Sequence, residues 1–530
     1  MNRKHIFVIV LNLCIAFGYY FGNLSANETH LSSDLHNIIP ICLKMDDPTM
    51  FPHDTFANDL ENVKYYTPFY VETLRFLAKF TDGDYVQALN ILTFICHILF
   101  GLLLYFLLFK ITNNFWASLV VSLLLRGTIW LPGLEYWGIS DLWSMMPRVV
   151  YYALLPLPFL FVNFTKKLKL FLAAFTIGFL LNFHPITGLS GILIFLGYLM
   201  THSYLEKNRF LAIFNSKNLL CVFFIFLGML PFFINYTNTI SVKADYDLTL
   251  YKEAFAAKYP IYFTDPTTFW KEWLKPKFFI YGLAVIAFVV LAYRKGIQKD
   301  KRRMKYMLII STLLFLLPNA AAFAEAMLNK LFEVNIRMSF QLVRMQKLLI
   351  LAAFFSILFS IDILYRNQQF KRIFPMIAGS FLLVLVLAKH STFDNIPFVS
   401  NDLIRRVLPN SLSLGNIQSG AENEGLYEIL TFIRNELPKD ALLFAPDVGR
   451  SGGQRSVVLD SKGANMLIEG NPKRFLEWYT DYKAFKKLSG KASNQFLRDY
   501  GVDYVLIYID LPEFKTIMKK GKWRLYEVNK

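Results

Sequence analysis

The chain has 530 residues, of which 55% are apolar and 18% are charged, and its mean hydropathy is +0.37. Soluble domains carry about 25% charged residues, so the composition excludes an ordinary soluble protein and indicates a polytopic membrane protein. We attribute the net charge of +17 to lysines and arginines beside membrane helices, not to nucleic-acid binding. The cysteines Cys14, Cys42, Cys96 and Cys221 show no CxxC or Cys/His spacing, so neither a zinc site nor a disulfide framework is expected.

The apolar segments predict a bundle of about eleven membrane-spanning helices. A helix needs about 20 apolar residues to cross the hydrocarbon core of a bilayer. In chain order, the candidate spans are residues 5–22, 88–109, 115–131, 146–161, 170–183, 188–200, 219–234, 278–293, 306–323, 348–364 and 374–388. The predicted fold class is a polytopic α-helical membrane protein.

The connections between these segments differ in charge. Alternate connections read FTKKLK, EKNRF, YRKGIQKDKRRMK and YRNQQFKR, and Arg3 and Lys4 precede the first span. Loops rich in Lys and Arg stay on the cytoplasmic side, so we predict a multi-pass protein of the cytoplasmic (inner) membrane with its N-terminus inside. Loops 23–87 and 237–277 would then lie outside. Alternatively, the first segment is a cleaved signal peptide, with its cleavage site in NLSANE.

The apolar runs stop beyond Lys389. Residues 1–389 are therefore predicted to form the transmembrane domain, and residues 390–530 a soluble extracytoplasmic α/β domain. LYEILTFIRNEL, KRFLEWYTDYKAFKKL and ASNQFLRDYG have helical spacing, whereas ALLFAP, RSVVLD, YVLIYI and WRLYEV are typical of short strands. The Gly-rich stretch DVGRSGGQRSVVLDSKG has neither Walker nor Rossmann spacing, so nucleotide binding is not predicted.

The loop after the first span is unusually polar. SSDLHNIIPICLKMDDPTMFPHD contains four aspartates, two histidines and three prolines. The spacing from Asp34 through Pro40 to Asp54, the FHPITGL turn at residues 183–189, and the tail sequence FLRDYGVDYVLIY resemble the GT-C superfamily of membrane glycosyltransferases. The resemblance implies an enzyme that transfers a sugar from a polyprenyl-phosphate-linked donor to an extracytoplasmic lipid, glycan or protein acceptor.

Within this resemblance, a carboxylate of the first outer loop acts as the general base, which takes the proton of the acceptor. We select Asp34 because it lies closest to the first span, and Asp54 as the second acid. With His53, Asp54 would also be the place for a divalent metal, Mg or Mn, if the reaction uses one; no metal site is otherwise expected. The structural alternatives are a helix N-cap for Asp34 and an Asx-turn for Asp54. His36, Asp46 and Asp47 are weaker candidates.

A lipid-phosphate leaving group needs cations at the membrane surface. Arg337, Arg344 and Lys347 fall within about 60° of one another on a helical projection, and charge at that boundary suggests function. The predicted substrate-binding residues are Arg148, His184, Arg337, Arg344, Lys347, Arg455 and Lys462. The structural alternatives are headgroup snorkelling for the helical stripe and a tight turn at His184.

Three other functions remain open from the sequence. The first is a lipid or polysaccharide transporter, although no inverted repeat with broken segments is evident. The second is a non-catalytic scaffold or assembly subunit of GT-C type, and the third is a glycan polymerase or ligase of another helical fold. The expected partners are the lipid-linked sugar, membrane lipid and the acceptor, and no nucleic acid.

Overall fold

The computed structural model describes residues 3–31, 34–63, 66–127, 145–238, 245–259, 265–273, 279–333, 342–367, 375 and 421–528. The chain divides into two compact units. Unit 1 comprises Met1–Asn23, Ile91–Pro231 and Pro260–Gly415, and unit 2 comprises Leu24–Asn90, Phe232–Tyr259 and Asn416–Lys530. Unit 2 thus combines the first polar loop with the C-terminal tail. The boundary predicted at residues 389 and 390 lies outside the described residues and stays a prediction.

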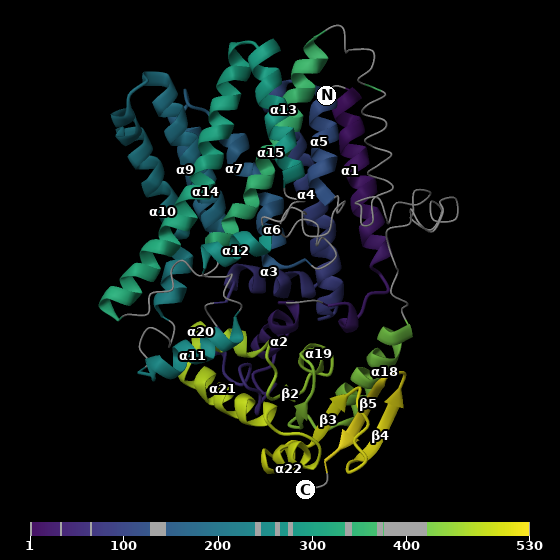
Figure 1. The fold of residues 1–530 in the computed structure, drawn as a ribbon. Helices are drawn as coiled ribbons and strands as arrows, with labels where there is room; N and C mark the ends of the chain where they lie inside the picture. Colours follow the sequence, from purple (N-terminus) through teal and green to yellow (C-terminus); the bar gives the residue numbers. More distant parts are fainter. Residues whose placement is uncertain are drawn as a thin grey trace. The chain divides into compact units, whose positions relative to one another are not determined.

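Unit 1 is helical (Figure 1). Its helices are α1 (Arg3–Gly22), α4 (Tyr85–Thr112), α5 (Phe115–Gly127), α6 (Pro147–Leu154), α7 (Pro156–Phe161), α8 (Lys167–Leu180), α9 (Pro185–Lys207), α10 (Ser216–Thr237), α12 (Pro266–Trp273), α13 (Phe279–Lys295), α14 (Gln298–Phe332) and α15 (Ile350–Arg366), of which α4 begins and α10 ends in unit 2. Within unit 1, α13 packs against α15, and α15 against α5 (Figure 1).

Five of the described helices, α1, α4, α9, α10 and α14, are long and apolar enough to cross a membrane. They confirm the prediction of a membrane protein. The full set of about eleven spans is not confirmed. Several predicted spans correspond to shorter apolar helices, and most of the span at residues 374–388 lies outside the described residues.

Charged residues at the start of α14 and the end of α15 pair with one another, and three of them, Asp300, Arg303 and Asp362, are buried. Arg303 donates to Asp362 at 2.7 Å and to Asp300 at 3.1 Å, and Arg366 donates to Asp300 at 2.8 Å. Asp300 is fully buried. Buried charges persist in folded proteins only when they are paired, so this cluster holds the two helix ends in register.

Two glycines allow a close approach of α8 and α10. A Cβ added at Gly178 would lie 2.1 Å from the backbone oxygen of Ile225, and one at Gly228 would lie 2.5 Å from that of Phe175. The Asn182 amide donates to the Gly228 carbonyl at 3.0 Å. Small residues and interhelical hydrogen bonds at such crossings drive helix association in membranes, where burial of apolar surface contributes little.

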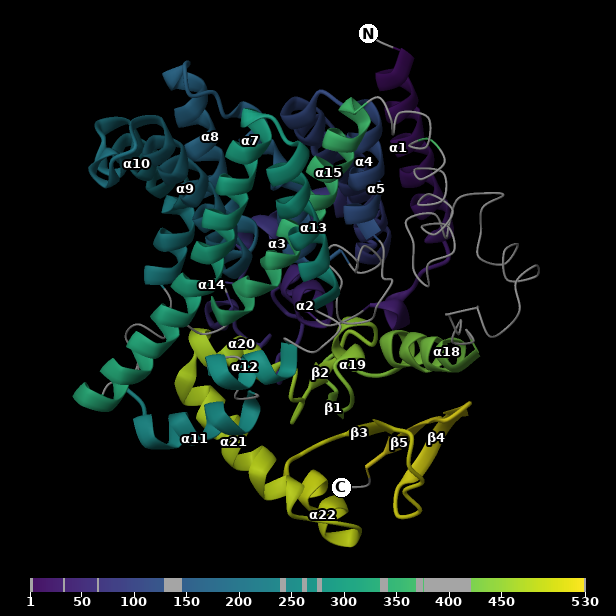
Figure 2. The same ribbon diagram turned by 45° about the horizontal axis from the view of Figure 1, so that its top comes forward.

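Unit 2 contains a five-stranded sheet. Its strands are β1 (Leu442–Phe444), β2 (Ser456–Val457), β3 (Tyr504–Ile507), β4 (Lys515–Lys520) and β5 (Trp523–Glu527), in the order β2-β1-β3-β5-β4. β1 pairs in parallel with β2 and β3, while β5 pairs antiparallel with β3 and β4 (Figure 2). The predicted C-terminal sheet is confirmed.

Helices cover both faces of this sheet because its side chains alternate. Leu443 and Leu506 pack against α18 (Ala421–Glu436) on one face, in a cluster with Ile429 and Ile433. Val505 packs on the other face with Leu497 of α22 (Lys491–Asp499).

The first polar loop is largely folded. It forms α2 (Leu35–Asp46) and α3 (Pro68–Ala78), which pack together, and α2 also packs against the short α19 (Val448–Ser451). Elsewhere in unit 2, α11 (Leu248–Lys258) packs along α21 (Pro472–Lys486), and α20 (Ala464–Gly470) precedes α21. The sequence suggested a polar loop, whereas every residue of α2 from Leu35 to Cys42 is buried.

Replacing Gly178 or Gly228 by leucine is expected to lower the thermal unfolding temperature of the purified protein in detergent, because neither backbone contact can accommodate a side chain. Gly282→Leu on α13 is the matched control, since a Cβ at Gly282 meets nothing within 4 Å. Equal unfolding temperatures for Gly178→Leu and Gly282→Leu would contradict the packing of α8 against α10.

Candidate functional site

Asp54, the second acid of the first loop, is fully buried. Its Oδ2 accepts from Arg450 Nε at 2.6 Å and from the Val457 backbone N–H at 2.9 Å. Its Oδ1 accepts from the backbone N–H groups of Phe56 and Ala57 at 3.0 and 2.9 Å. A carboxylate offers about four acceptor positions, and protein donors use all four here. Asp54 therefore joins the first loop to strand β2.

Arg450 has no exposed surface and lies between two carboxylates, Asp54 and Asp460. Its Nη2 donates to Asp460 Oδ1 at 2.8 Å, and the ring of Phe56 lies 4.5 Å from the guanidinium carbon. Burial by itself would lower the pKa of Arg450, but Asp460 and Asp54 together raise it above its ordinary value. We call Asp54, Arg450 and Asp460 the Arg450 cluster.

The Arg450 cluster orients the turn formed by residues 460–463. Asp460 accepts from the Gly463 backbone N–H at 2.6 Å. A Cβ at Gly463 would lie 2.7 Å from the Asp460 carboxylate and 2.8 Å from the ring of Phe56. A side chain at residue 463 would displace these two groups, so glycine suits this close approach, and the turn carries Ser461 and Lys462.

Asp34, the first acid of the loop, pairs with this turn. Its Oδ1 accepts from Lys462 Nζ at 2.7 Å, and the Asp34 side chain is 20% exposed. Asp34 precedes α2, but its side chain does not cap that helix. One turn later, Asn37 is fully buried and donates to the Lys462 carbonyl at 3.1 Å. Within unit 2, the structure thus brings two of the predicted site residues together, Asp34 and Lys462.

Two further groups lie in this region: His36, a weaker candidate from the sequence, and Lys258, which sequence reasoning missed. His36 Nδ1 lies 2.8 Å from Ser451 Oγ, and burial lowers the pKa of His36 in spite of nearby Asp447. The Lys258 ammonium, at the end of α11, contacts both the backbone and the side-chain oxygen of Ser461. No sequence motif marks Lys258, and only the folded chain relates it to residue 461.

The other predicted residues of unit 2 have structural contacts. Arg455 is buried and donates to the carbonyls of Arg434 and Leu437 at 2.8 and 2.7 Å, near the end of α18. Burial lowers the pKa of Arg455, although Asp440 opposes this. His53 is exposed. Among the described residues, no three His, Cys, Asp or Glu side chains are grouped to hold a metal ion, and a metal at Asp54 would have to displace Arg450.

The predicted residues of unit 1 are described only in part. His184 caps α9, since its Nδ1 accepts from the Thr187 backbone N–H at 3.3 Å. Arg148 follows Pro147 at the start of α6 and is half-buried. Arg337, and the side chains of Arg344 and Lys347, lie outside the described residues, so their ligand role stays a prediction.

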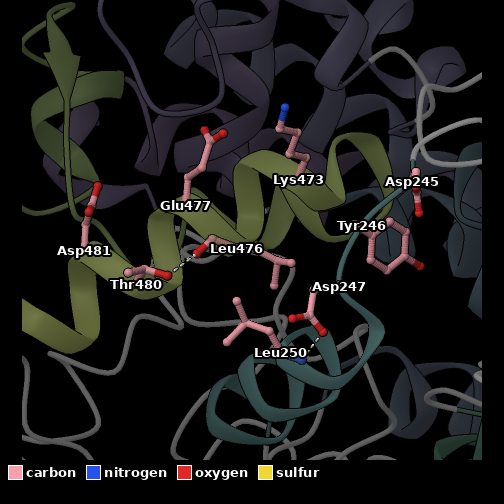
Figure 3. Close-up of a pocket in the computed structure, with 9 residues that line it drawn as sticks. All are labelled: Asp245, Tyr246, Asp247, Leu250, Lys473, Leu476, Glu477, Thr480 and Asp481. Atoms are coloured by element: carbon pink, nitrogen blue, oxygen red, sulfur yellow. Dashed lines mark hydrogen bonds between the residues drawn. The ribbon is translucent and has the colours of Figure 1, made fainter.

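A surface hollow of about 710 Å³ lies between the start of α11 and the side of α21 (Figure 3). Its lining is Asp245, Tyr246, Asp247, Leu250, Lys473, Leu476, Glu477, Thr480 and Asp481. Asp247 caps α11 by accepting from two backbone N–H groups. Four carboxylates against one lysine disfavour an anionic ligand, so this hollow does not fit the phosphate of a lipid-linked sugar.

No protein-family model matches the chain, and no curated protein does. Among solved structures, the chain is similar to a crystal structure of the Archaeoglobus fulgidus oligosaccharyltransferase in complex with Zn and sulfate. The match covers 94% of this chain and 67% of that chain, with 12% sequence identity and a TM-score of 0.43. A likeness this distant decides neither the function nor the site.

Arg450→Met is expected to destabilise the protein severely, because it leaves two buried carboxylates without their cation. Removing one partner of a buried pair typically costs about 3–5 kcal/mol. Lys515→Met, which breaks the exposed pair with Glu527, is the control and should leave thermal unfolding in detergent unchanged. Indistinguishable unfolding of Arg450→Met and the unmodified protein would refute the structural role of the cluster.

Proposed function

We propose that the chain is a membrane glycosyltransferase that moves a sugar from a polyprenyl-phosphate-linked donor to an extracytoplasmic lipid, glycan or protein, with Asp34 as general base. The proposal rests chiefly on the pairing of Asp34 with Lys462. A partly exposed carboxylate lies 2.7 Å from an ammonium on the turn at residues 460–463, and the chain also carries helices that can cross a membrane.

The chemistry requires both charges. An acceptor hydroxyl is a weak nucleophile at neutral pH, so a carboxylate must take its proton as the new glycosidic bond forms. The bond between the anomeric carbon and the donor's phosphate oxygen breaks, and the phosphate leaves as an anion. A lysine beside the base stabilises that anion. Asp34 can meet this need because its side chain is reachable, whereas the oxygens of Asp54 are held by protein donors.

A non-catalytic scaffold is the second candidate. It is favoured by the contacts of Asp54 and Arg455, which are buried and bonded to other parts of unit 2. In a scaffold, the Asp34–Lys462 pair would have the same purely structural task. A lipid or polysaccharide transporter has no specific observation in its favour among the described residues.

Asp34→Asn keeps the shape of the side chain and removes its basicity, so product formation should fall by about 10² to 10⁴. Asp47→Asn is the matched control in the same loop, because Asp47 is partly exposed and its side chain accepts from Thr49 in its own turn. The assay is sugar transfer by purified protein from a polyprenyl-phosphate-linked donor, with thermal unfolding of each variant checked. Full activity of Asp34→Asn would exclude its role as base.

Unit 2 is proposed to lie outside the cytoplasmic membrane. Cys42 cannot report this, since it is buried and burial raises the pKa of its thiol well above the ordinary value. With Cys14 replaced by serine, a cysteine at the partly exposed position of Asp47 should react with a membrane-impermeant maleimide in intact cells, and cysteines at Lys166 and Lys301 should not. Labelling at Lys301 but not at Asp47 would reverse the proposed orientation.

A further inference from the structure

Three lysines from different elements of unit 2 lie near one another, and two of them lie against an aromatic pair. Lys258 ends α11, Lys462 belongs to the turn at residues 460–463, and Lys486 ends α21. The Lys258 ammonium lies 5.8 Å from the centre of the Trp478 ring. Lys486 lies 5.0 Å from the ring of Tyr482, which stacks on Trp478 at 4.8 Å. We call Lys258, Lys462, Lys486 and Trp478 the lysine cluster.

Positive charge exceeds negative charge around Lys258. Burial lowers the pKa of Lys258 to about 8; Asp460 raises this pKa, and Lys462 and Lys486 lower it further. The carboxylates near the cluster are Asp460, which holds Arg450, and Asp34, which pairs with Lys462. Like charges that converge in a partly buried place destabilise one another, and a bound anion would relieve that repulsion.

The indole of Trp478 supplies an independent observation. Trp478 is 4% exposed, and its Nε1 is buried without a hydrogen-bond acceptor among the described residues. A buried Trp N–H usually has a partner, and a missing one indicates an ion or water that completes the site. The Lys258 ammonium lies 5.8 Å from the centre of this ring, so an anion bound by Lys258 would lie close to the indole.

We propose that the lysine cluster is a binding site for a phosphate or pyrophosphate group. Lysine binds phosphate as a mobile point charge, and an ammonium has three donors, of which Lys258 directs two to Ser461. The site explains why Lys258 is held near the turn that carries Lys462. That the phosphate belongs to a lipid-linked sugar rests on the proposed function, whereas the site itself does not.

The test is calorimetric titration of the purified full-length protein in detergent with inorganic pyrophosphate at pH 7. Lys258→Gln should weaken binding at least tenfold, and Trp478→Phe, which keeps the stacking on Tyr482, should weaken it less. Lys252→Gln is the matched control, because Lys252 is an exposed lysine on the same helix. Saturable binding that is equal in Lys258→Gln and Lys252→Gln, or no binding to the unmodified protein, would overturn the site.

The pH dependence gives a second readout. Lys258 loses its proton as pH rises through about 8, so the affinity ratio of unmodified protein to Lys258→Gln should shrink between pH 7 and pH 9. The titration of pyrophosphate itself cancels in this ratio. So does the titration of the other charged groups near Lys258, because both proteins contain them: Asp34, Asp460, Lys462 and Lys486. A ratio that does not change with pH would place the bound anion away from Lys258.

Two further titrations separate the sources of the phosphate. A polyprenyl monophosphate in detergent that competes with pyrophosphate supports the site and assigns it to a lipid ligand. Competition by phosphatidic acid vesicles, but not by phosphatidylcholine vesicles, supports a general lipid-phosphate site. If pyrophosphate binds through Lys258 but the protein transfers no sugar, the phosphate site is supported and the proposed glycosyltransferase activity is refuted. If sugar transfer depends on Asp34 but no phosphate binds the lysine cluster, the proposed glycosyltransferase is supported and the phosphate site is refuted.

Discussion

Arg450 is the residue on which the rest of unit 2 depends. Moving a guanidinium out of water costs several kcal/mol unless carboxylates and acceptors replace the lost solvent. Arg450 finds one carboxylate 396 positions away, at Asp54, and the other 10 positions away, at Asp460. The first contact fixes the polar loop on the sheet, and the second fixes the turn that presents Ser461 and Lys462. The position of the Asp34–Lys462 pair therefore depends on the buried Arg450 guanidinium, which need not contact a ligand.

Unit 1 also contains a buried arginine that is paired with two aspartates. Arg303, which is buried, lies between Asp300 and Asp362, and Arg366 adds a second cation to Asp300. The sequence reading attributed the basic segment QKDKRR to the cytoplasmic ends of membrane helices. The structure adds that some of these charges pair inside the unit. In both units, an arginine between two aspartates secures segments that are far apart in the chain.

The predictable parts of the fold are those that local patterns determine. Apolar runs predicted α1, α4 and α10 to within a few residues, because hydropathy is a property of consecutive side chains. Four of the five strands were predicted from β-branched and aromatic runs, whereas β4 (KTIMKK) was missed because lysines fill three of its six positions. The helix α2 was also missed, since Pro40 lies inside it and its polar residues suggested a loop.

The site was less predictable, for a physical reason. Asp34 and Lys462 were each selected from the sequence, but their contact joins residues 428 positions apart, and no pattern in one segment specifies its partner in another. The roles of Arg450 and Lys258 were missed for the same reason. The Gly-rich stretch that ends at Gly463 matched no nucleotide-binding spacing, and no local pattern indicated that Phe56 and Asp460 lie against Gly463.

Asp54 and Asp34, both in the first loop, differ in what their carboxylates can do: Asp54 is suited to a structural role and Asp34 to a chemical one. A general base must exchange a proton with a ligand, so it needs an oxygen that a ligand can reach. Asp54 fails this requirement because four protein donors surround it without solvent access. Asp34 is partly exposed, and its partner is a lysine, whose flexible ammonium can follow an anion more readily than a guanidinium held by two carboxylates. The bonds of Asp54 hold the first loop against β2, and Asp34 lies in the same loop beside Lys462. Any activity of the first loop should therefore depend on Asp54 through the order of the turn and on Asp34 through proton transfer.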